Sequence, residues 1–394
     1  MSIAKIGNDC CSCKACINAC RHNAIKSIVD EQGFEQIQID ENACVECGLC
    51  EKVCPILSKP VFNTEHKNNY ACYALDSNIK RQGSSGGLFG TFATYIIDKG
   101  GVVYGAAFDH SLQLKTTRVT AVEDLTPLYK SKYLLCDTCN QYPNIKKDLE
   151  NGLQVLYCAT PCQISALRLF LRKDYDNLYT IEFVCHGVGS QTMFNDSVKY
   201  IQDKKDIKII NFRFREKYKS AASHHYFSYD YEKNGKCYTE KGLYLYFPYY
   251  NAYCKQLNCR NICYNCHYAT EQRVADITFG DFHNIAKYDQ SIDRFAGVSM
   301  ITCNSDKGIE LFEKVKDSLY LKPFDWEILR DNNRFHGGDS RPKESRSFME
   351  SYKKGGMERV VVEYLKPSKD WKRLLYYNSP SIIRRILTKI LLWN

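Results

Sequence analysis

Two short stretches decide the fold of this chain: C-C-S-C-K-A-C-I-N-A-C at residues 10–20 and C-V-E-C-G-L-C-E-K-V-C at residues 44–54. The spacing C-x2-C-x2-C-x3-C occurs first at Cys10, Cys13, Cys16 and Cys20, and again at Cys44, Cys47, Cys50 and Cys54. Each cysteine of the first set lies 34 residues before its counterpart. Four matches at one offset indicate an internal duplication.

Three cysteines within seven residues are typical of a tight loop that wraps a cubane iron–sulfur cluster, while a fourth, one helical turn further on, reaches the other cluster. The expected ligands are Cys10, Cys13, Cys16 and Cys54 for one 4Fe-4S cluster, and Cys44, Cys47, Cys50 and Cys20 for the second. A pair of zinc sites is the alternative, although zinc usually takes two CxxC pairs separated by a longer loop. Cys11 is not needed as a ligand.

The residues between the two motifs, I-K-S-I-V-D-E-Q-G-F-E-Q-I-Q-I-D, predict two short strands around Gly33. Arg21 stands where the second motif has Pro55, a change that affects the surroundings of a cluster rather than its ligands. The segment Ile3–Leu57 resembles a bacterial-type two-cluster ferredoxin.

The composition bounds the rest of the chain. Its 394 residues suit two or three domains, and 44% hydrophobic residues are enough for a sizeable core. The N-terminus M-S-I-A-K-I-G-N-D-C-C lacks the apolar region of a signal peptide, and no apolar run of about 18 residues appears. We therefore expect a cytoplasmic protein, in which 21 cysteines indicate metal binding or catalysis rather than disulfides.

The net charge of +9 is concentrated at the C-terminal end, where residues 341–394 hold 13 Lys and Arg against 5 Asp and Glu. The remainder is nearly neutral, which argues against a nucleic-acid-binding body. The last residues, S-P-S-I-I-R-R-I-L-T-K-I-L-L-W-N, predict a basic amphipathic helix. Such a helix can lie on an anionic membrane surface, so the protein would be peripheral at the inner face of the membrane. The alternative is a helix docked on the body or on a partner subunit.

After a polar linker, the chain alternates between predicted strands and helices. A Gly/Ser turn at Ser84–Gly87 leads into a helix with an apolar face at residues 88–96, and strand-like residues follow at 101–108. Free backbone N–H groups of this turn would suit an anion such as a phosphate. A capped helix after a flexible turn is the plainer interpretation.

The next block, L-Q-V-L-Y-C (153–158), a helix at 163–171 and L-Y-T-I-E-F-V-C (178–185), predicts a parallel strand–helix–strand crossover. Thr160 is the expected N-cap and Pro161 the first helical residue. Cys158, Cys162 and Cys185 then fall near the carboxyl ends of neighbouring strands, where open α/β sheets place their ligands.

Further cysteines leave several interpretations open. Cys263 and Cys266 form a CxxC pair, with Cys259 nearby, and Cys136 and Cys139 could join that pair in a four-thiolate zinc site. Cys162 or Cys185 could instead be a nucleophile beside His186. The isolated cysteines are interpreted as ordinary buried residues: Cys72, Cys237, Cys254 and Cys303.

Six short motifs occur in one order along the chain: SSGG (84–87), KSKY (130–133), ATPCQ (159–163), CHGV (185–188), RNICYNC (260–266) and DITFGDF (276–282). Their order over residues 70–319 resembles the coenzyme F-420 hydrogenase/dehydrogenase beta-subunit family, in which a fused ferredoxin module is common. That family includes ferredoxin-dependent reductases and bacterial members tied to surface-polysaccharide pathways.

The resemblance implies FAD and one further 4Fe-4S cluster in the body. The implied ligands of the third cluster are Cys162, Cys185, Cys263 and Cys266, with Cys158 as an accessory residue. The implied flavin contacts are Ser84, Ser85, Gly86, Gly87, Lys130, Ser131, Lys132, Thr160 and Pro161.

Two departures from the family pattern concern the hydride partner. His283 stands where the family has Trp, and Thr116-Thr117-Arg118 stand where many members carry a His, so binding of the deazaflavin coenzyme F-420 is left open. The candidate proton-supplying residues are His186, Asp281 and His283, together with Asp276. A structural role in turns is the alternative for the two aspartates.

The prediction is an α+β or α/β protein divided into a two-cluster ferredoxin-like domain (1–58), a linker (59–69), the two parts of a mixed flavin-binding body with a partly parallel sheet (70–150 and 151–320), and a helical basic tail (321–394). Its predicted function is that of an iron–sulfur flavoprotein oxidoreductase. It would pass electrons between a low-potential carrier, ferredoxin or coenzyme F-420, and a small-molecule substrate, with a role in surface-polysaccharide metabolism. The alternatives are a non-catalytic electron-transfer subunit of a larger complex and a zinc-bound structural protein. The sequence is compatible with an oligomer.

Overall fold

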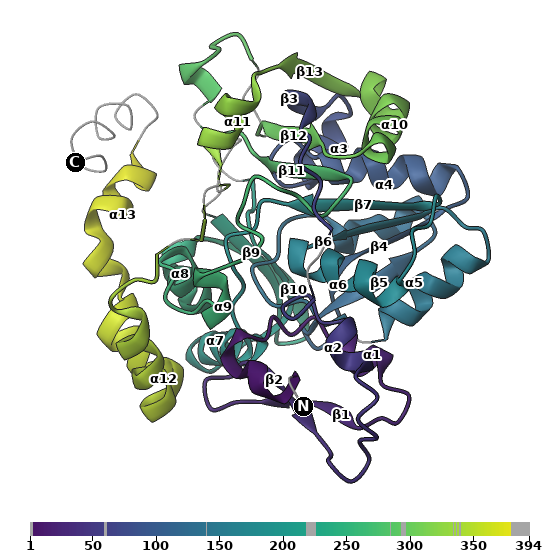
Figure 1. Ribbon diagram of the computed structural model, residues 1–394. Coiled ribbons are helices and arrows are strands. Elements are labelled where there is room, and N and C mark those ends of the chain that lie inside the picture. Colours follow the sequence, from purple (N-terminus) through teal and green to yellow (C-terminus); the bar gives the residue numbers. More distant parts are fainter. Residues whose placement is uncertain are drawn as a thin grey trace.

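The computed structural model describes residues 3–58, 61–138, 140–217, 226–283, 285–292, 297–333, 335, 337–338 and 340–379. An eight-stranded sheet with the order β13-β3-β12-β11-β7-β6-β4-β5 runs through the body (Figure 1). Its strands are β3 (Lys67–Ala74), β4 (Val102–Phe108), β5 (Leu114–Val119), β6 (Val155–Ala159), β7 (Leu178–Phe183), β11 (Ile277–Asp281), β12 (Ser299–Cys303) and β13 (Leu319–Pro323).

The middle of this sheet is parallel. β4 pairs with β6, β6 with β7, and β7 with β11, whereas the outer pairings are antiparallel. The predicted crossover is confirmed, because α6 (Pro161–Leu171) connects two parallel neighbours, β6 and β7. The carboxyl ends of β6, β7 and β11 therefore meet at one edge of the sheet, where a ligand site is expected.

Helices cover both faces of the sheet. On one face α4 (Leu88–Asp98) and α10 (Asp306–Val315) pack against Val103 and Leu156. On the other face α5 (Gln141–Glu150) and α6 pack against Val102 and Tyr157. Neighbouring residues of one strand thus point into different cores, as the two-residue period of a strand requires.

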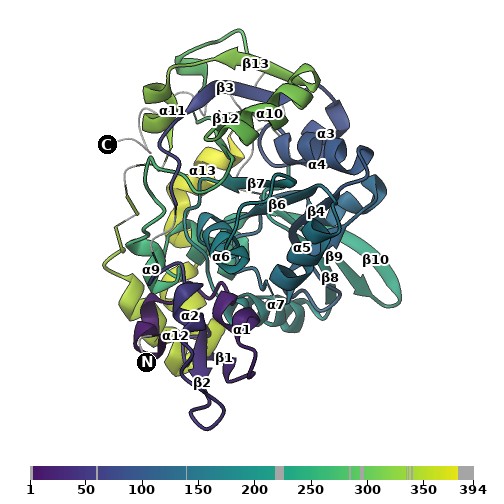
Figure 2. The same cartoon turned by 45° about the vertical axis from the view of Figure 1, so that its right-hand side comes forward.

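The ferredoxin-like module lies against the face that carries α5 and α6 (Figures 1 and 2). It contains the predicted strand pair, β1 (Ile25–Val29) and β2 (Glu35–Ile39), and two short helices, α1 (Ala15–Ala19) and α2 (Leu49–Lys52). Thr138 of the body donates a hydrogen bond to the Cys13 carbonyl (2.9 Å), and Lys14 forms an ion pair with Asp137 (2.7 Å). The two modules are therefore joined by specific polar contacts as well as by apolar packing.

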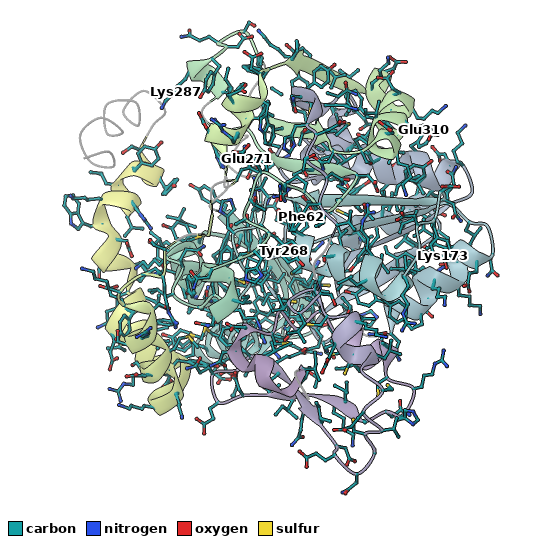
Figure 3. The ribbon with its side chains drawn as sticks, in the orientation of Figure 1. Phe62, Lys173, Tyr268, Glu271, Lys287 and Glu310 are labelled. Carbon is teal, nitrogen blue, oxygen red and sulfur yellow. The ribbon has the colours of Figure 1, made fainter. Side chains whose placement is uncertain are left out.

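The same junction includes an aromatic pair, which Figure 3 labels between the module and the sheet. The rings of Phe62 and Tyr268 lie 6.0 Å apart, and the Tyr268 hydroxyl donates to the Pro55 carbonyl at 3.0 Å. Asn63 also forms a backbone bridge with Arg273. The segment after the module is thus tied to the body rather than separated from it.

A second, antiparallel sheet of three strands, β8 (Lys208–Arg213), β9 (Tyr226–Lys233) and β10 (Lys236–Leu243), packs in an aromatic core. Phe194, Phe212 and Phe247 are central to that core. The remaining helices are α3 (Ser77–Gln82), α7 (Gln191–Lys205), α8 (Pro248–Cys254), α9 (Asn261–Tyr264), α11 (Trp326–Asn332), α12 (Ser345–Val360) and α13 (Trp371–Asn378).

The fold class is the predicted mixture of α and β structure with a partly parallel sheet, a ferredoxin-like module and a helical C-terminal region. Two strands cross the predicted divisions of the chain: β3 begins inside the linker 59–69, and β13 spans position 320. The predicted C-terminal amphipathic helix lies outside the described residues. No helix among the described residues is long and apolar enough to span a membrane.

Ile181 lies at the centre of the sheet, fully buried between β6 and β11. We expect Ile181→Ala to lower the free energy of unfolding by about 2–5 kcal/mol, because it removes buried methyl groups and leaves a cavity. Denaturant unfolding followed by circular dichroism measures this change. Ile28→Ala, at a position that is 41% exposed, is the matched control, and an equal loss in both variants would contradict the assigned core.

Candidate functional site

Two adjoining cavities lie at the edge where the parallel strands end. The smaller one, about 50 Å³, is called the cysteine cavity because four of the predicted ligands line it: Cys162, Cys185, Cys263 and Cys266. The larger one, about 230 Å³, is called the strand-end cavity. The structure thus brings together cysteines that are separated by up to about one hundred positions in the sequence.

Each of these cysteines is positioned by a strand end or a short helix. Cys162 is in the first turn of α6, and Cys185 follows the end of β7. Cys263 is in α9, and Cys266 comes just after it. Burial, and then the neighbouring Cys185 thiol, raise the pKa of Cys263.

Gly187 explains how the loop after β7 approaches the CxxC segment so closely. Its φ of 98° lies in the region that favours glycine, and a Cβ atom there would lie 3.1 Å from the Cβ of Cys263 and 3.2 Å from the Sγ of Cys259. The close approach of two cysteine-bearing segments is what a compact multi-thiolate centre requires.

The first ferredoxin motif reaches the cysteine cavity through Cys11. Burial raises the pKa of Cys16 to about 12, with further contributions from the Cys10 and Cys54 thiols, so three of the four expected ligands are neighbours. The buried Cys11 lines the cysteine cavity, and its thiol interacts with Cys13 and Cys162. Cys11 therefore lies between the first ferredoxin set and the body cysteines, a position that its sequence did not indicate.

The second ferredoxin set reaches the surface at Cys47. Cys20 and Cys50 pack in the small core of the module, whereas Cys47 is exposed and Val45 is 58% exposed.

Among the described residues, no group of three or more His, Cys, Asp or Glu is spaced to hold a metal ion. The four thiolates that bind a cubane cluster are attached to four different iron atoms, so the width of the cluster separates them. The ligands of a single zinc ion all bind one atom and therefore lie closer together.

The strand-end cavity is lined by most of the predicted flavin contacts: Ser84, Ser85, Gly87, Lys130, Ser131, Lys132 and Thr160. Pro161 lines the cysteine cavity instead, and Gly86 lines neither. Gly86 donates its N–H to the Ser299 hydroxyl (2.8 Å), and Gly87 donates to the Ser84 carbonyl (2.9 Å). The prediction of free N–H groups in this turn is therefore wrong for these two residues, because internal hydrogen bonds use them.

The lysines of the KSKY motif are held by different partners. Lys130 forms an ion pair with Glu216 at 3.4 Å. Lys132 donates to the carbonyls of Pro127 (2.8 Å) and Tyr129 (2.7 Å), and burial lowers its pKa to about 7. Both side chains line the strand-end cavity, so an anion bound there would meet positive charge.

The sequence interpretation missed three further residues of this cavity. Arg215 contributes a guanidinium, while Tyr133 and Tyr253 contribute stacked rings 4.5 Å apart. The run R-F-R-E-K at 213–217 carries basic residues at alternate positions, a signal that could have indicated charges on one face of a strand. The aromatic pair joins residues far apart in the sequence and left no local signal.

The three predicted catalytic residues, His186, Asp281 and His283, all line the strand-end cavity. Asp281 accepts two hydrogen bonds from Arg215, at 2.8 and 2.9 Å. Burial by itself would lower the pKa of Arg215. The neighbouring Asp281 carboxylate has the opposite effect, and the pKa of Arg215 is raised overall. This geometry favours the alternative role of Asp281, a structural carboxylate.

Asp276 also has a structural position. It is buried and accepts hydrogen bonds from Thr180 and Ser305, with Arg168 at 3.2 Å. Burial opposes ionisation, but Arg168 and the other donors lower its pKa. These contacts join β7, α6 and α10 beneath the site.

The predictions for the helix cap and for the isolated cysteines are confirmed only in part. Thr160 occupies the N-cap position of α6 but makes no capping hydrogen bond, because its hydroxyl contacts Cys162 and Gln163 instead. Cys72 and Cys303 are buried as predicted, and Cys254 is partly buried. The prediction for Cys237 is wrong, because the edge strand β10 leaves its side chain exposed.

The remaining cysteines lie around the two cavities. Cys158 and Cys136 line the strand-end cavity, and burial raises the pKa of Cys158 to about 12. Cys136 contacts the Thr116 hydroxyl (3.5 Å) and lines the cysteine cavity as well. The proposed zinc partner Cys139 lies outside the described residues.

A common wall separates the two cavities. In addition to Cys136, five residues line both cavities: Thr160, Gln163, Cys185, Gly187 and Val188. A group held by the four cysteines would therefore lie one side chain away from a ligand of the strand-end cavity. This short separation suits electron exchange between two bound groups.

The Arg215–Asp281 ion pair can be tested by substitution. Arg215 is only 8% exposed, so replacing Asp281 by a neutral residue would remove the carboxylate that compensates a buried charge. We expect Asp281→Asn to lower the free energy of unfolding by about 3–5 kcal/mol, since a buried charge is left uncompensated. Asp203→Asn, which breaks the exposed pair with Lys199, is the control and should change the unfolding midpoint little. A stable Asp281→Asn protein would contradict the structural role.

Two models of known protein families match parts of the chain. Residues 9–56 match a 4Fe-4S dicluster domain, and residues 152–326 match the C terminus of the coenzyme F420 hydrogenase/dehydrogenase beta subunit. No curated protein matches the chain in sequence. One solved structure, the xenon-derivatised F420-reducing [NiFe] hydrogenase complex from Methanosarcina barkeri, is similar with 17% identity and a TM-score of 0.44, over 76% of this chain and 93% of that one. Residues 152–326 are therefore related to the coenzyme F420 hydrogenase/dehydrogenase beta-subunit family, a 4Fe-4S dicluster domain precedes them, and the chain is an iron–sulfur redox protein.

Proposed function

We propose that this protein is an iron–sulfur flavoprotein oxidoreductase that connects a low-potential carrier to a small substrate. The observation that carries the proposal is the common wall between the cysteine cavity and the strand-end cavity. A protein that only stores electrons needs no second cavity, whereas an oxidoreductase needs a place where a cofactor meets its substrate.

The residues fit three cubane clusters. The first would be held by Cys10, Cys13, Cys16 and Cys54, the second by Cys20, Cys44, Cys47 and Cys50, and the third by Cys162, Cys185, Cys263 and Cys266. When bound, such clusters supply single-electron transfer. The first cluster would lie nearer the third, because Cys11 of the first motif lines the cysteine cavity, and the second would reach the surface at the exposed Cys47.

The strand-end cavity fits FAD in its chemistry. Its lining combines apolar and aromatic side chains with a few polar groups, as cofactor sites do. The hydroxyl of Ser84 and the amines of Lys130 and Lys132 would bind phosphates, and the Tyr133–Tyr253 stack offers an aromatic surface. When bound, a flavin exchanges hydride equivalents with one partner and single electrons with another.

The chain's own residues would carry the proton and exclude water. His186 and His283 line the strand-end cavity and are its candidate proton carriers. Asn332 fixes the backbone of His283, since its side chain accepts from the backbone N–H of His283 (2.6 Å) and donates to the backbone carbonyl (2.7 Å). Arg215 is engaged by Asp281 and fixes the neighbouring wall.

The external carrier would be a ferredoxin or another redox protein, or coenzyme F-420 itself. The exposure of Cys47 and Val45 favours a second candidate function, an electron-transfer subunit that docks a partner through this face. Turnover of a small substrate by the isolated chain would decide for the enzyme. A surface-polysaccharide pathway, contact of the tail with a membrane and assembly into an oligomer are further parts of the proposal.

Metal and flavin analysis of anaerobically purified protein tests the proposal directly. We expect about 12 iron atoms and one FAD per chain, and about 8 iron atoms in Cys263→Ala, because that variant loses one cluster. Cys237→Ala, which changes an exposed cysteine away from both cavities, should keep the full iron content. Colourless protein containing zinc, or about 8 iron atoms and no flavin in the unsubstituted chain, would refute it.

The pKa of Lys132 predicts a pH dependence for FAD binding. An anionic ligand prefers protonated Lys132, so the affinity for FAD should fall as the pH rises from 6 to 8 through the lysine pKa of about 7. Lys132→Gln should bind FAD about tenfold more weakly at pH 6, where a charge-assisted hydrogen bond is lost, and should show a flatter pH profile. Flavin fluorescence quenching measures both.

The control for this experiment is Lys146→Gln, which changes a surface lysine paired with Glu150. Lys217, whose pKa burial also lowers to about 7, contacts the Ser85 carbonyl at 2.8 Å and accounts for a residual slope. A Lys132→Gln profile as steep as that of the unsubstituted protein would contradict the role of Lys132.

A further inference from the structure

Two buried arginines line the cysteine cavity. Arg260 and Arg273 are each 2% exposed, and each has one terminal nitrogen without a hydrogen-bond partner among the described residues: Nη1 of Arg260 and Nη2 of Arg273. Buried guanidinium groups normally satisfy their donors, because an unsatisfied charged donor costs free energy. No acceptor among the described residues therefore serves these two nitrogens, and both side chains line the cysteine cavity.

The other nitrogens of Arg260 bind neutral oxygens. Nε donates to the Cys10 carbonyl, and Nη2 donates to the Glu35 carbonyl and, at 3.4 Å, to the Gln36 amide oxygen. No carboxylate of the described chain forms an ion pair with this side chain. Arg260 thus holds a buried positive charge that the protein itself does not compensate, an arrangement that favours a bound anion.

Arg273 is arranged differently. Its Nε is paired with the fully buried carboxylate of Glu182, and its Nη1 donates to the carbonyls of Tyr268 (3.1 Å) and Thr270 (3.0 Å). The Arg273–Glu182 pair is close to neutral as a whole. Arg273 therefore offers the cavity a hydrogen-bond donor, while Arg260 offers a donor and a net charge.

We propose that Arg260 is the counter-charge of the iron–sulfur centre held by Cys162, Cys185, Cys263 and Cys266, and that it raises the reduction potential of that centre. The proposal rests on the third cluster of the proposed function. A cluster with four thiolate ligands is anionic and becomes more negative by one unit when it gains an electron. A buried cation beside it stabilises the reduced form more than the oxidised form, and N–H donors to its sulfurs act in the same direction.

The test is a potentiometric titration of the full-length chain followed by electron paramagnetic resonance. The component that Cys263→Ala removes identifies the third centre. In Arg260→Gln we expect the ratio of reduced to oxidised third centre to fall about tenfold at a fixed potential, which corresponds to a midpoint about 59 mV lower for a one-electron couple. Arg260→Lys keeps the charge and should remain closer to the unsubstituted protein.

Two variants separate charge from structure. Lys14→Gln removes ion pairs with Glu35 and Asp137 at the same module junction but does not line the cysteine cavity, so it should leave the midpoint unchanged. Glu182→Gln leaves Arg273 uncompensated and should raise the midpoint. This second variant tests the same electrostatic effect if Arg260→Gln does not fold.

The outcomes distinguish this inference from the function on which it rests. About 8 iron atoms per chain and no third component would refute the third cluster itself. A third component that is present but has the same midpoint in Arg260→Gln and Glu182→Gln would overturn the role of the arginines alone. An equal drop in Lys14→Gln and Arg260→Gln would also overturn it, because module docking would then explain the change.

Discussion

The parallel pairing of β6, β7 and β11 is the constraint on which the rest of the structure depends. Parallel neighbours end at the same edge of a sheet, so the turns that follow them are forced together. Here Cys162 and Cys185 lie just beyond the ends of β6 and β7 and line the cysteine cavity, while Asp281 is the last residue of β11 and lines the strand-end cavity. Antiparallel pairing of β6 and β7 would send Cys162 and Cys185 to opposite edges and leave no common site.

The ferredoxin-like module depends on this edge for its orientation. Its contacts with the body include hydrogen bonds to backbone carbonyls, from Thr138 to Cys13, from Tyr268 to Pro55 and from Arg260 to Cys10. Such bonds have defined directions, whereas apolar packing alone would tolerate rotation. They hold the first cysteine set against the body, so that Cys11 lies between it and Cys162.

The charges around the two cavities follow one pattern. Arg215 and Lys130 have carboxylate partners, and Arg273 has Glu182. Arg260 and Lys132 differ, because all their described partners are neutral oxygens. Burial lowers the pKa of Lys132 to about 7, so this lysine can lose its charge, whereas an arginine keeps it. Since an uncompensated buried charge is costly, Arg260 favours an anion in the cysteine cavity, and a thiolate-bound cluster would be one.

The sequence alone determined what was local. The duplicated cysteine spacing, the strands around Gly33 and the crossover at residues 153–185 all follow from patterns within a few dozen residues, and the structure confirms the last two. The family resemblance named Cys162, Cys185, Cys263 and Cys266 as ligands, and the structure places these four cysteines in the lining of one cavity. Only the tertiary structure decided which polar groups are already used in hydrogen bonds: Gly86 bonds to Ser299, and Asp281 to Arg215. It also decided the positions of Cys11, Arg260 and the Tyr133–Tyr253 stack, which depend on packing. The physical reason is that a hydrogen bond or an ion pair between distant segments depends on how elements pack, and no spacing rule within one segment reports it.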